Sequence, residues 1–216
     1  MNAIAISVYG TDPKYLVGAI RNGRTAQTVY PGWDCIFYVA SDVPEDTVRQ
    51  LANVGYVRPM GKAQGSTGMF WRFLAASSRN VEYAIFRDAD STLNIRESAA
   101  VAAWVDSGLD CHAMHDHIHH RIFPLHGGMW GIRGGVIMDM AEQIAKWSRK
   151  SKWGDDQHFL RSVIWPRVKG RCLRHARADL VDSKDFPWPA VPFPDHGVVG
   201  GFVGEVINPE DERFNQ

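Results

Sequence analysis

The hydrophobic residues of this chain come in short runs that alternate with longer segments of helical periodicity. Residues 3–8, rich in Ile and Val, form a nearly continuous apolar run, which is typical of a strand buried on both faces of a parallel sheet. Comparable runs predict further strands at residues 35–39, 55–59, 81–86, 111–114 and 170–175.

Helical segments separate these runs, and two of them carry clear start signals. Asp12-Pro13 places an N-cap residue before a proline at the first helical position. Asn94 and Glu97 have the spacing of a capping box. Further helices are predicted near residues 41–52, from residue 67, and at 135–147 and 154–164. Because strands alternate with helices, we predict an α/β protein with a mostly parallel central sheet flanked by helices, forming one domain over residues 1–216.

Composition narrows the functional classes. The 216 residues are 45% hydrophobic and include 24 basic and 24 acidic side chains, so net charge indicates neither a nucleic-acid partner nor a membrane surface. The N-terminus lacks the features of a signal peptide, and no window approaches the roughly 20 apolar residues of a membrane span. Three widely spaced cysteines predict free thiols in a reducing compartment, so we expect a cytoplasmic protein.

Two carboxylates follow the predicted strand at 81–86, namely Asp88 and Asp90. Ligands of open α/β sheets bind beyond the carboxyl ends of the strands. In an extended backbone residues i and i+2 point the same way, so both aspartates could reach one divalent cation. Such an ion would offset the charge on a nucleoside-diphosphate leaving group.

This acidic pair is the centre of a series of motifs spread over residues 3–176. Upstream lie Tyr9-Gly10-Thr11-Asp12, after the first strand, and Trp71-Arg72-Phe73, on the helix before the acidic strand. Downstream lie Gly127-Gly128-Met129-Trp130-Gly131 and Asp155-Asp156-Gln157. The series resembles, in the same order, the motifs of GT-A nucleotide-sugar glycosyltransferases, and its Asp-Gln pair resembles that of glycogenin-like and related bacterial transferases.

The resemblance implies a GT-A fold, which is Rossmann-like and binds nucleotides, together with a donor site and a metal site. The implied donor-binding residues are Tyr9, Gly10, Thr11, Arg72, Asp88, Ala89, Asp90, Gly127, Gly128 and Trp130. The implied metal is Mn²⁺ or Mg²⁺, held by Asp88 and Asp90. His175 would be the third ligand, and His196 is an alternative.

Elementary chemistry agrees with several of these roles. The planar guanidinium of Arg72 suits an oxyanion such as a phosphate. Gly127 and Gly128 carry no Cβ, so their backbone could approach a sugar closely, and Trp130 offers an apolar face for a pyranose ring. Each of these features also fits a plain structural role.

Asp155, Asp156 and Gln157 are the candidate catalytic residues at the start of a predicted helix. One of the two aspartates can cap the helix, which leaves the other free to face the site. In an inverting enzyme that carboxylate would be the general base toward the acceptor hydroxyl. In a retaining enzyme Asp156 or Gln157 would lie near the anomeric carbon. We prefer Asp156 for the active-site role.

Five histidines crowd residues 112–120. The spacing fits neither of two common zinc patterns, and no cysteine joins it. We interpret Asp116 and His117 as contacts to the donor sugar or the acceptor, because their polar groups match sugar hydroxyls. A structural zinc site and a solvated loop are the alternatives.

The sequence therefore predicts a metal-dependent hexosyl- or pentosyltransferase. It would transfer a sugar from a nucleoside-diphosphate sugar, with UDP favoured, to a hydroxyl of a glycan, lipid, protein or modified nucleobase. A nucleotidyltransferase would use the same paired carboxylates, but that class usually carries a glycine-rich basic loop after its first strand. A non-enzymatic His-rich module that binds metal or carbohydrate is the third hypothesis.

Overall fold

The computed structural model describes residues 1–147, 152, 154–181, 183–184, 187–194 and 201–208. Eight strands lie in this part of the chain: β1 (Asn2–Val8), β2 (Trp33–Val39), β3 (Tyr56–Pro59), β4 (Tyr83–Arg87), β5 (Cys111–His115), β6 (Trp130–Arg133), β7 (Cys172–Ala176) and β8 (Val191–Pro192). The α-helices are α1 (Pro13–Val29), α2 (Glu45–Ala52), α3 (Ile95–Ser107), α4 (Met140–Trp147), α5 (Asp155–Phe159), α6 (Trp165–Val168) and α7 (Ala178–Val181). In the same part of the chain, three segments have 3-10 geometry: η1 (Gly65–Ser77), η2 (Ile118–Ile122) and η5 (Lys169–Arg171). The segment η4 (Leu160–Ile164) is a π-helical turn.

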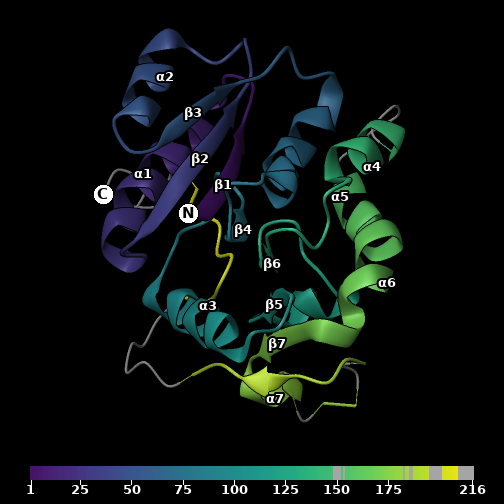
Figure 1. The fold of residues 1–216 in the computed structure, drawn as a ribbon. Helices are drawn as coiled ribbons and strands as arrows, with labels where there is room; N and C mark the ends of the chain where they lie inside the picture. The colour runs from purple at the N-terminus through teal and green to yellow at the C-terminus, as the bar shows by residue number, and fades with distance from the viewer. Residues whose placement is uncertain (148–151, 153, 182, 185–186, 195–200, 209–216) are drawn as a thin grey trace.

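The strands form one sheet in the order β3-β2-β1-β4-β6-β5-β7-β8. Neighbouring strands are parallel except where β6 lies, because β6 runs antiparallel to both β4 and β5. The mostly parallel α/β sheet predicted from the sequence is confirmed. β1 and β4 are parallel neighbours in the middle of this sheet, so their carboxyl ends lie close together (Figure 1).

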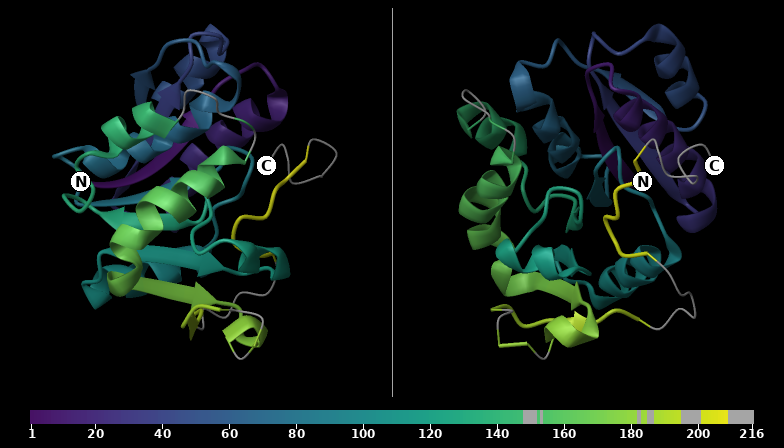
Figure 2. Two further views of the ribbon diagram at one scale, coloured as in Figure 1. Left: turned by 90° about the vertical axis from the view of Figure 1, so that its right-hand side faces the viewer. Right: turned by 180° about the vertical axis from the view of Figure 1, so that it is seen from behind.

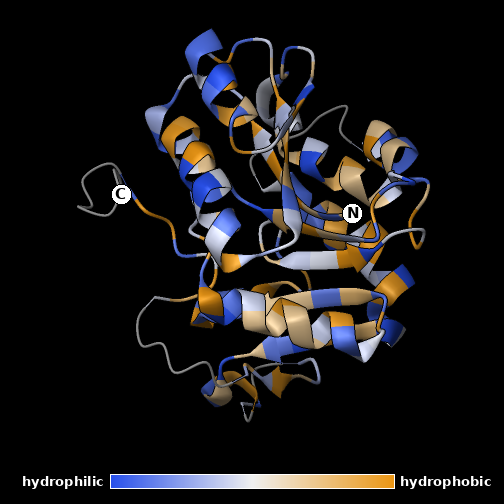
Figure 3. Cartoon of the chain, turned by 60° about the vertical axis from the view of Figure 1, so that its left-hand side comes forward, coloured by the Kyte–Doolittle hydropathy of each residue, from blue (hydrophilic) through white to orange (hydrophobic). Residues whose placement is uncertain are grey.

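Alternate side chains of the central strands face two different helical layers. On β1, Ile4 and Ile6 pack with α1 and α3, whereas Ala3 and Ala5 face η1, α4 and the α5–α6 segment. Figures 1 and 2 show helices on both sides of the sheet. Most helices in Figure 3 carry both hydrophobic and hydrophilic residues, as expected for helices with one buried side. Burial on both faces explains the continuous apolar strands.

Local signals place some helix ends correctly. The Asp12 side chain accepts from the backbone N–H of Lys14 at 2.9 Å, and Pro13 opens α1. Asn94 caps α3 by accepting from the N–H of Glu97 at 2.9 Å. The predicted return bond from the Glu97 side chain is replaced by a buried ion pair with Arg87.

Several boundaries differ from the prediction. β6 was not predicted, because its four residues follow two glycines and look like part of a loop. The helix expected near 41–52 starts at Glu45 without a side-chain cap, and the one expected from 135 starts at Met140. The segment expected as one helix at 154–164 contains a π turn and continues to Val168.

All three cysteines are free thiols, as predicted from their spacing. Cys35 and Cys111 are buried and Cys172 is partly buried. Burial raises the pKa of the Cys35 thiol to about 12, which keeps it protonated and unreactive at neutral pH. Within the described ranges, no helix has both the length and the apolarity needed to cross a membrane.

Candidate functional site

The end of β4 sends two neighbouring charged side chains to opposite faces of the sheet. Because side chains alternate along a strand, Arg87 points toward α3 and Asp88 toward η1. Arg87 is buried, and its Nε lies 3.2 Å from Glu97 Oε1, which also accepts from the Tyr30 hydroxyl at 2.9 Å. Arg87 therefore fastens β4 to α3 and does not partner the aspartates.

Arg72 joins two predicted site carboxylates that lie 68 positions apart in the sequence (88 and 156). Its Nη1 lies 2.6 Å from Asp88 Oδ1, and its Nη2 lies 2.9 Å from Asp156 Oδ2. Its backbone N–H donates to the Ser7 hydroxyl at 2.9 Å, which fastens η1 to β1. The Arg72 side chain is 5% exposed, so the guanidinium faces the two carboxylates rather than an open phosphate site.

Two glycines allow the loop before β6 to pass close to these carboxylates. A Cβ on Gly128 would lie 2.1 Å from Asp88 Oδ2, and one on Gly127 would lie 2.3 Å from Asp156 Oδ2. The Gly127 N–H also donates to Gln157 Oε1 at 3.2 Å. The predicted close approach of this backbone is present, and its observed neighbours are protein carboxylates.

The two aspartates at the start of α5 have separate roles. Asp155 accepts from the backbone N–H of Lys152 at 2.8 Å and closes a surface turn. Asp156 is buried against Arg72, with its other oxygen accepting from the Gln157 N–H at 3.0 Å. Burial raises the pKa of Asp156, and the positive charge of Arg72 opposes that rise. A buried carboxylate with a raised pKa is a stronger base than an exposed one.

Asp90 lies in a turn rather than in extended backbone. The argument that residues i and i+2 point the same way therefore does not apply to Asp88 and Asp90. Asp88 pairs with Arg72 from η1, whereas Asp90 Oδ2 lies 2.8 Å from Lys14 Nζ of α1. Each acidic side chain of the pair thus has its own protein cation.

Asn22 of α1 holds the turn that carries the aspartates, and the sequence interpretation missed it. Its Nδ2 donates to the Ser91 carbonyl at 2.8 Å and lies 3.4 Å from the carbonyls of Asp88 and Ala89, and its Oδ1 accepts from the Leu93 N–H at 3.3 Å. The available signal was a polar residue on the inner side of an amphipathic helix.

The carbonyl of Ala89 also packs closely against α1. A Cβ on Gly18 would lie 2.2 Å from that carbonyl oxygen, so a side chain at this position would displace the turn. The Ala89 side chain itself is buried, and its predicted place in the donor site is therefore limited to the backbone.

The loop after β1 lies at the same carboxyl ends of the parallel strands as the turn after β4. The Tyr9 ring makes an edge contact with Trp71, at 6.2 Å between centroids, and packs on Gly68. Gly10 has φ of +76° and donates its N–H to Asp42 Oδ1 at 3.1 Å, whereas Thr11 is exposed. Burial raises the pKa of the Tyr9 hydroxyl, so it stays protonated at neutral pH. A nucleoside contact at these residues stays a prediction.

Trp130 does not offer a face to a sugar. The side chain is 0% exposed and packs on Phe86, at 4.3 Å between ring centroids, and on Phe73. Its position on β6 points it into the core, so the expectation that it binds donor is corrected to a structural role.

His175 lies on β7 and not beside the aspartates. Its Nδ1 is 2.8 Å from His112 Nε2 of β5, and β5 and β6 separate β7 from β4 in the sheet. The expectation of His175 as a third metal ligand is therefore corrected: the side chain closes a buried His–His contact. His196 lies outside the described residues.

Asp116 and His117 are also occupied by the protein itself. Arg96 binds both oxygens of Asp116 at 2.8 Å, and the Val203 N–H donates to Oδ2 at 3.0 Å. His117 accepts from the His119 N–H, and its ring lies tilted against that of Phe202, at 4.7 Å between centroids. The buried Asp116 carboxylate is thus a structural anchor, which corrects its predicted contact to a sugar or acceptor.

The zinc alternative for the His-rich segment finds no ligand set. His120 Nδ1 accepts from the backbone N–H groups of Asp116 and His117, and His126 Nε2 lies 2.7 Å from the His120 carbonyl. Among the residues that the structure describes, no three His, Cys, Asp or Glu side chains are grouped to hold a metal ion.

The buried histidines predict sensitivity to acid. Burial lowers the pKa of His115 to about 3 and that of His120 to about 2. The unfolded chain takes up these protons near pH 6.5 and the folded protein does not, so stability is lost as pH falls below 6.5. Each histidine should cost about 2 kcal/mol by pH 5. Urea unfolding at pH 7.5, 6 and 5 measures this loss.

The variant His115→Asn separates one histidine from the rest. Asn can keep a hydrogen bond near the position of Nδ1 but does not titrate in this range. The loss of stability between pH 6.5 and 5 should become smaller by about one proton's contribution, roughly 1.4 kcal/mol per pH unit. A stability that does not change between pH 7.5 and 5 in the parent protein would contradict the assignment of neutral buried histidines.

A divalent ion fits Asp88 and Asp90 only with help from a ligand. The Asp88 side chain is 46% exposed, and one oxygen of each aspartate lies in an ion pair. Mg²⁺ commonly binds through one or two carboxylates, substrate phosphates and water. Asp88 and Asp90 each have one carboxylate oxygen outside these ion pairs, so Mn²⁺ or Mg²⁺ held there would need a diphosphate and water for the rest of its coordination.

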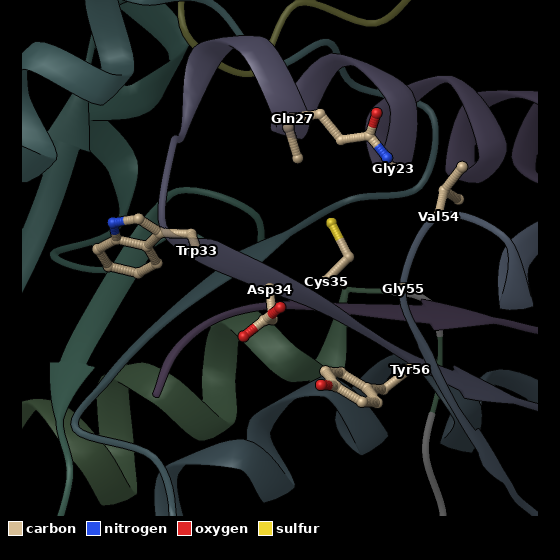
Figure 4. A pocket seen from close by; sticks show the side chains of 9 residues that line it. Gly23, Gln27, Trp33, Asp34, Cys35, Val54, Gly55 and Tyr56 are labelled. Atoms are coloured by element: carbon tan, nitrogen blue, oxygen red, sulfur yellow. The ribbon is translucent and has the colours of Figure 1, made fainter.

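A cavity of about 300 Å³ lies at the other end of the parallel strands. It is lined by the first residues of β2 and β3 and by the second half of α1 (Figure 4). The Cys35 side chain points toward α1, while Asp34 and Tyr56 point away from it. The charged and glycine-rich groups described above lie at the carboxyl ends of the strands, where α/β proteins bind ligands, so we place the site there.

The segment at residues 201–208 closes one side of the turn after β4. The Thr92 N–H donates to the Glu205 carbonyl at 3.2 Å, and the Ile207 N–H donates to the Asp90 carbonyl at 3.1 Å. Figure 2 shows this yellow segment returning from the region of α3 toward the N-terminal half. The backbone that carries Asp90 is therefore held from two sides, by Asn22 and by this segment.

Comparisons with known proteins place the fold. The chain matches no protein-family model, and no curated protein sequence matches it. The WbbM bifunctional glycosyltransferase is similar in structure, with a TM-score of 0.51 and 13% identity over 79% of this chain and 38% of that one. CMP:2-keto-3-deoxy-manno-octonic acid synthetase, in a complex with CTP, has a TM-score of 0.50 and 11% identity over 82% of this chain and 90% of that one.

At these identities the similarity concerns the fold alone. The chain has the GT-A-type α/β fold that these two proteins share, as the sequence predicted. One of the two is a glycosyltransferase and the other a synthetase complexed with CTP, so the chemistry has to be argued from the site.

Proposed function

We propose that the chain is a metal-dependent glycosyltransferase that acts as one domain over residues 1–216. It would transfer a sugar from a nucleoside-diphosphate sugar, with UDP favoured, to a hydroxyl acceptor. The observation that carries the proposal is the Asp88–Arg72–Asp156 ion-pair chain, over which the Gly127–Gly128 backbone passes. It unites, in one place, the motifs that resemble those of GT-A glycosyltransferases.

The nucleotidyltransferase alternative is less well supported. That class usually carries a glycine-rich basic loop after the first strand, where this chain has residues 9–12 with a single glycine, and its first basic side chain is Lys14 in α1. The Gly-Gly pair instead precedes β6 and lies against the carboxylates of Asp88, just after β4, and of Asp156, the second residue of α5.

In the proposed reaction, the chain's own residues bind and orient the two substrates. Asp88 and Asp90 would hold the metal ion, which supplies positive charge to the departing nucleoside diphosphate. Arg72 keeps the carboxylates of Asp88 and Asp156 at fixed positions, so no reorganisation is needed at the moment of reaction. Asp156, whose pKa is raised by burial, would accept the proton of the acceptor hydroxyl.

A panel of donors tests the proposal directly. The protein is incubated with Mn²⁺ and UDP-, GDP-, ADP- and dTDP-sugars, and release of nucleoside diphosphate is measured. In parallel, CTP or UTP is supplied with sugar phosphates or sugar acids, and pyrophosphate release is measured. We expect nucleoside diphosphate from at least one donor. Pyrophosphate release alone would establish the alternative, and Mn²⁺ binding without release of either product would favour a binding module.

A further inference from the structure

Lys14 is the second residue of α1, and its side chain reaches the turn after β4. Its Nζ is 2.8 Å from Asp90 Oδ2, and its side chain is 24% exposed. The helix start is fixed by the Asp12 cap and by Pro13, so the Lys14 backbone is anchored, whereas a lysine side chain has a flexible four-carbon stem. A single ammonium group thus reaches the acidic turn from outside the core.

The two cations of the site differ in how firmly they are held. Arg72 is 5% exposed and bridges two carboxylates with a rigid guanidinium. Lys14 makes one ion pair through a single ammonium group; its side chain is 24% exposed and that of Asp90 is 11% exposed, so water screens the pair only in part. A divalent cation, with twice the charge, can compete with Lys14 for Asp90, whereas Arg72 is held by two carboxylates at once.

The charge of the site favours this exchange. Asp88, Asp90 and Asp156 bring three carboxylates, and Arg72 and Lys14 bring two positive charges. The group therefore retains an excess of negative charge that attracts a divalent cation. Once such an ion occupies Asp90, the Lys14 ammonium loses its partner and lies at the sheet edge where a diphosphate would meet the metal.

We propose that Lys14 is a diphosphate-binding residue that is held on Asp90 in the empty site and moves to the donor's phosphate oxygens when a divalent ion takes its place. The exchange forms and breaks ion pairs only, and no covalent bond changes. The proposal rests on the proposed function, because it requires a metal–diphosphate at Asp90. It adds a nucleotide-binding group that the motif order did not indicate.

The variant Lys14→Met tests the exchange, because Met keeps the length of the side chain and removes its charge. Mn²⁺ affinity without nucleotide, measured by EPR of free Mn²⁺, should rise about two- to five-fold, since a competitor for Asp90 is gone. UDP affinity in saturating Mn²⁺, measured by calorimetry, should fall about ten-fold or more, since a charge-assisted contact is lost. A merely structural lysine would not move the two affinities in opposite directions.

Lys146→Met is the matched control. Lys146 is an exposed lysine of α4 that pairs with Glu142 at 2.6 Å, far along the chain from the aspartates. It should leave both affinities unchanged. If Lys14→Met raises Mn²⁺ affinity but leaves UDP affinity intact, Lys14 is only a competitor and the proposal is overturned. A fall in both affinities overturns it as well.

Binding of Mn²⁺ and nucleoside diphosphates to the wild-type protein tests the proposed function separately from the role of Lys14. If wild type binds neither Mn²⁺ nor any of UDP, GDP, CDP, ADP and dTDP, the proposed function fails and the role of Lys14 fails with it. If wild type binds Mn²⁺ and a nucleoside diphosphate, the proposed donor site stands, and the opposite shifts in Lys14→Met then decide on Lys14 alone.

Discussion

Replacing Arg72 with methionine should lower the free energy of unfolding by about 3–5 kcal/mol, because removing one partner of a buried ion pair leaves uncompensated charge. The Asp156 carboxylate is buried beside the guanidinium, and Asp88 loses the same partner. We expect Asp156 to become protonated in the variant, so the pKa of this carboxyl should rise further. Urea unfolding at pH 7.5 measures the stability, and unfolding across pH 5–8 shows the change in proton uptake.

Arg49→Met is the control for charge and size. Arg49 pairs with Glu45 and Asp46 on the surface of α2, and its side chain is 63% exposed. Pairs of this kind contribute about 0.5 kcal/mol or less, so the control should unfold close to the parent midpoint. If Arg72→Met unfolds with a midpoint like that of Arg49→Met, the ion-pair chain does not hold the site together.

Adding one methyl group at Gly128 should lower donor turnover about 100-fold while the protein stays folded. In Gly128→Ala the new Cβ would lie 2.1 Å from Asp88 Oδ2, 2.6 Å from its Cγ and 3.0 Å from its backbone nitrogen. The Asp88 carboxylate has to move, and displacements of about 1 Å at a reacting site cost on the order of 100-fold in rate. Initial rates with the donor found in the panel give the measurement.

Gly170→Ala is the control, because it adds the same methyl group where the structure has room for it. Nothing lies within 4 Å of a Cβ built on Gly170, which belongs to the exposed η5 turn. This variant should keep parental turnover and parental Mn²⁺ affinity. Gly128→Ala should also weaken Mn²⁺ binding, since Asp88 is a proposed ligand. Full activity in Gly128→Ala would mean that the loop before β6 and Asp88 do not meet during turnover.

The sequence predicted the sheet because its strands are buried on both faces. Runs such as residues 3–8 require no partner information to be recognised as parallel strands. β6 escaped prediction for the opposite reason. It has four residues, follows a glycine pair and runs antiparallel between β4 and β5, so its conformation depends on neighbours that are distant in sequence.

The same contrast between local and distant contacts explains the helix starts. The Asn94 cap is a local hydrogen bond and was predicted correctly. The capping box also assigned Glu97 to the helix end, yet its carboxylate meets Arg87 and Tyr30 in the core. A buried cation offers a stronger partner than a backbone N–H, but only the fold brings it within reach.

The sequence predicted which residues come together in the candidate site better than it predicted how their side chains pair. Motif order identified Arg72, Asp88 and Asp156, which the structure brings together. It could not show that the Arg72 guanidinium donates to two protein carboxylates, or that Asp90 forms an ion pair with Lys14. Those facts follow from the turn after β4, whose conformation is fixed by partners from elsewhere in the chain.

Residues in buried polar contacts misled the prediction most. Asp116 and His175 look like ligands in a sequence because their types bind sugars and metals. In the structure Arg96 occupies both oxygens of Asp116, and His112 lies 2.8 Å from His175. Protein groups occupy both oxygens of Asp116, and contacts of this kind cannot be read from a motif.

The segment at residues 201–208 makes the order of synthesis matter for the site. During translation, β1 to β4 and the Asn22 side chain emerge long before Ile207, so the sheet can assemble while the turn after β4 still lacks one of its two backbone partners. The Asp90 carbonyl gains the N–H of Ile207 only when residue 207 has left the ribosome. The acidic turn is therefore completed by one of the last parts of the described chain to be made.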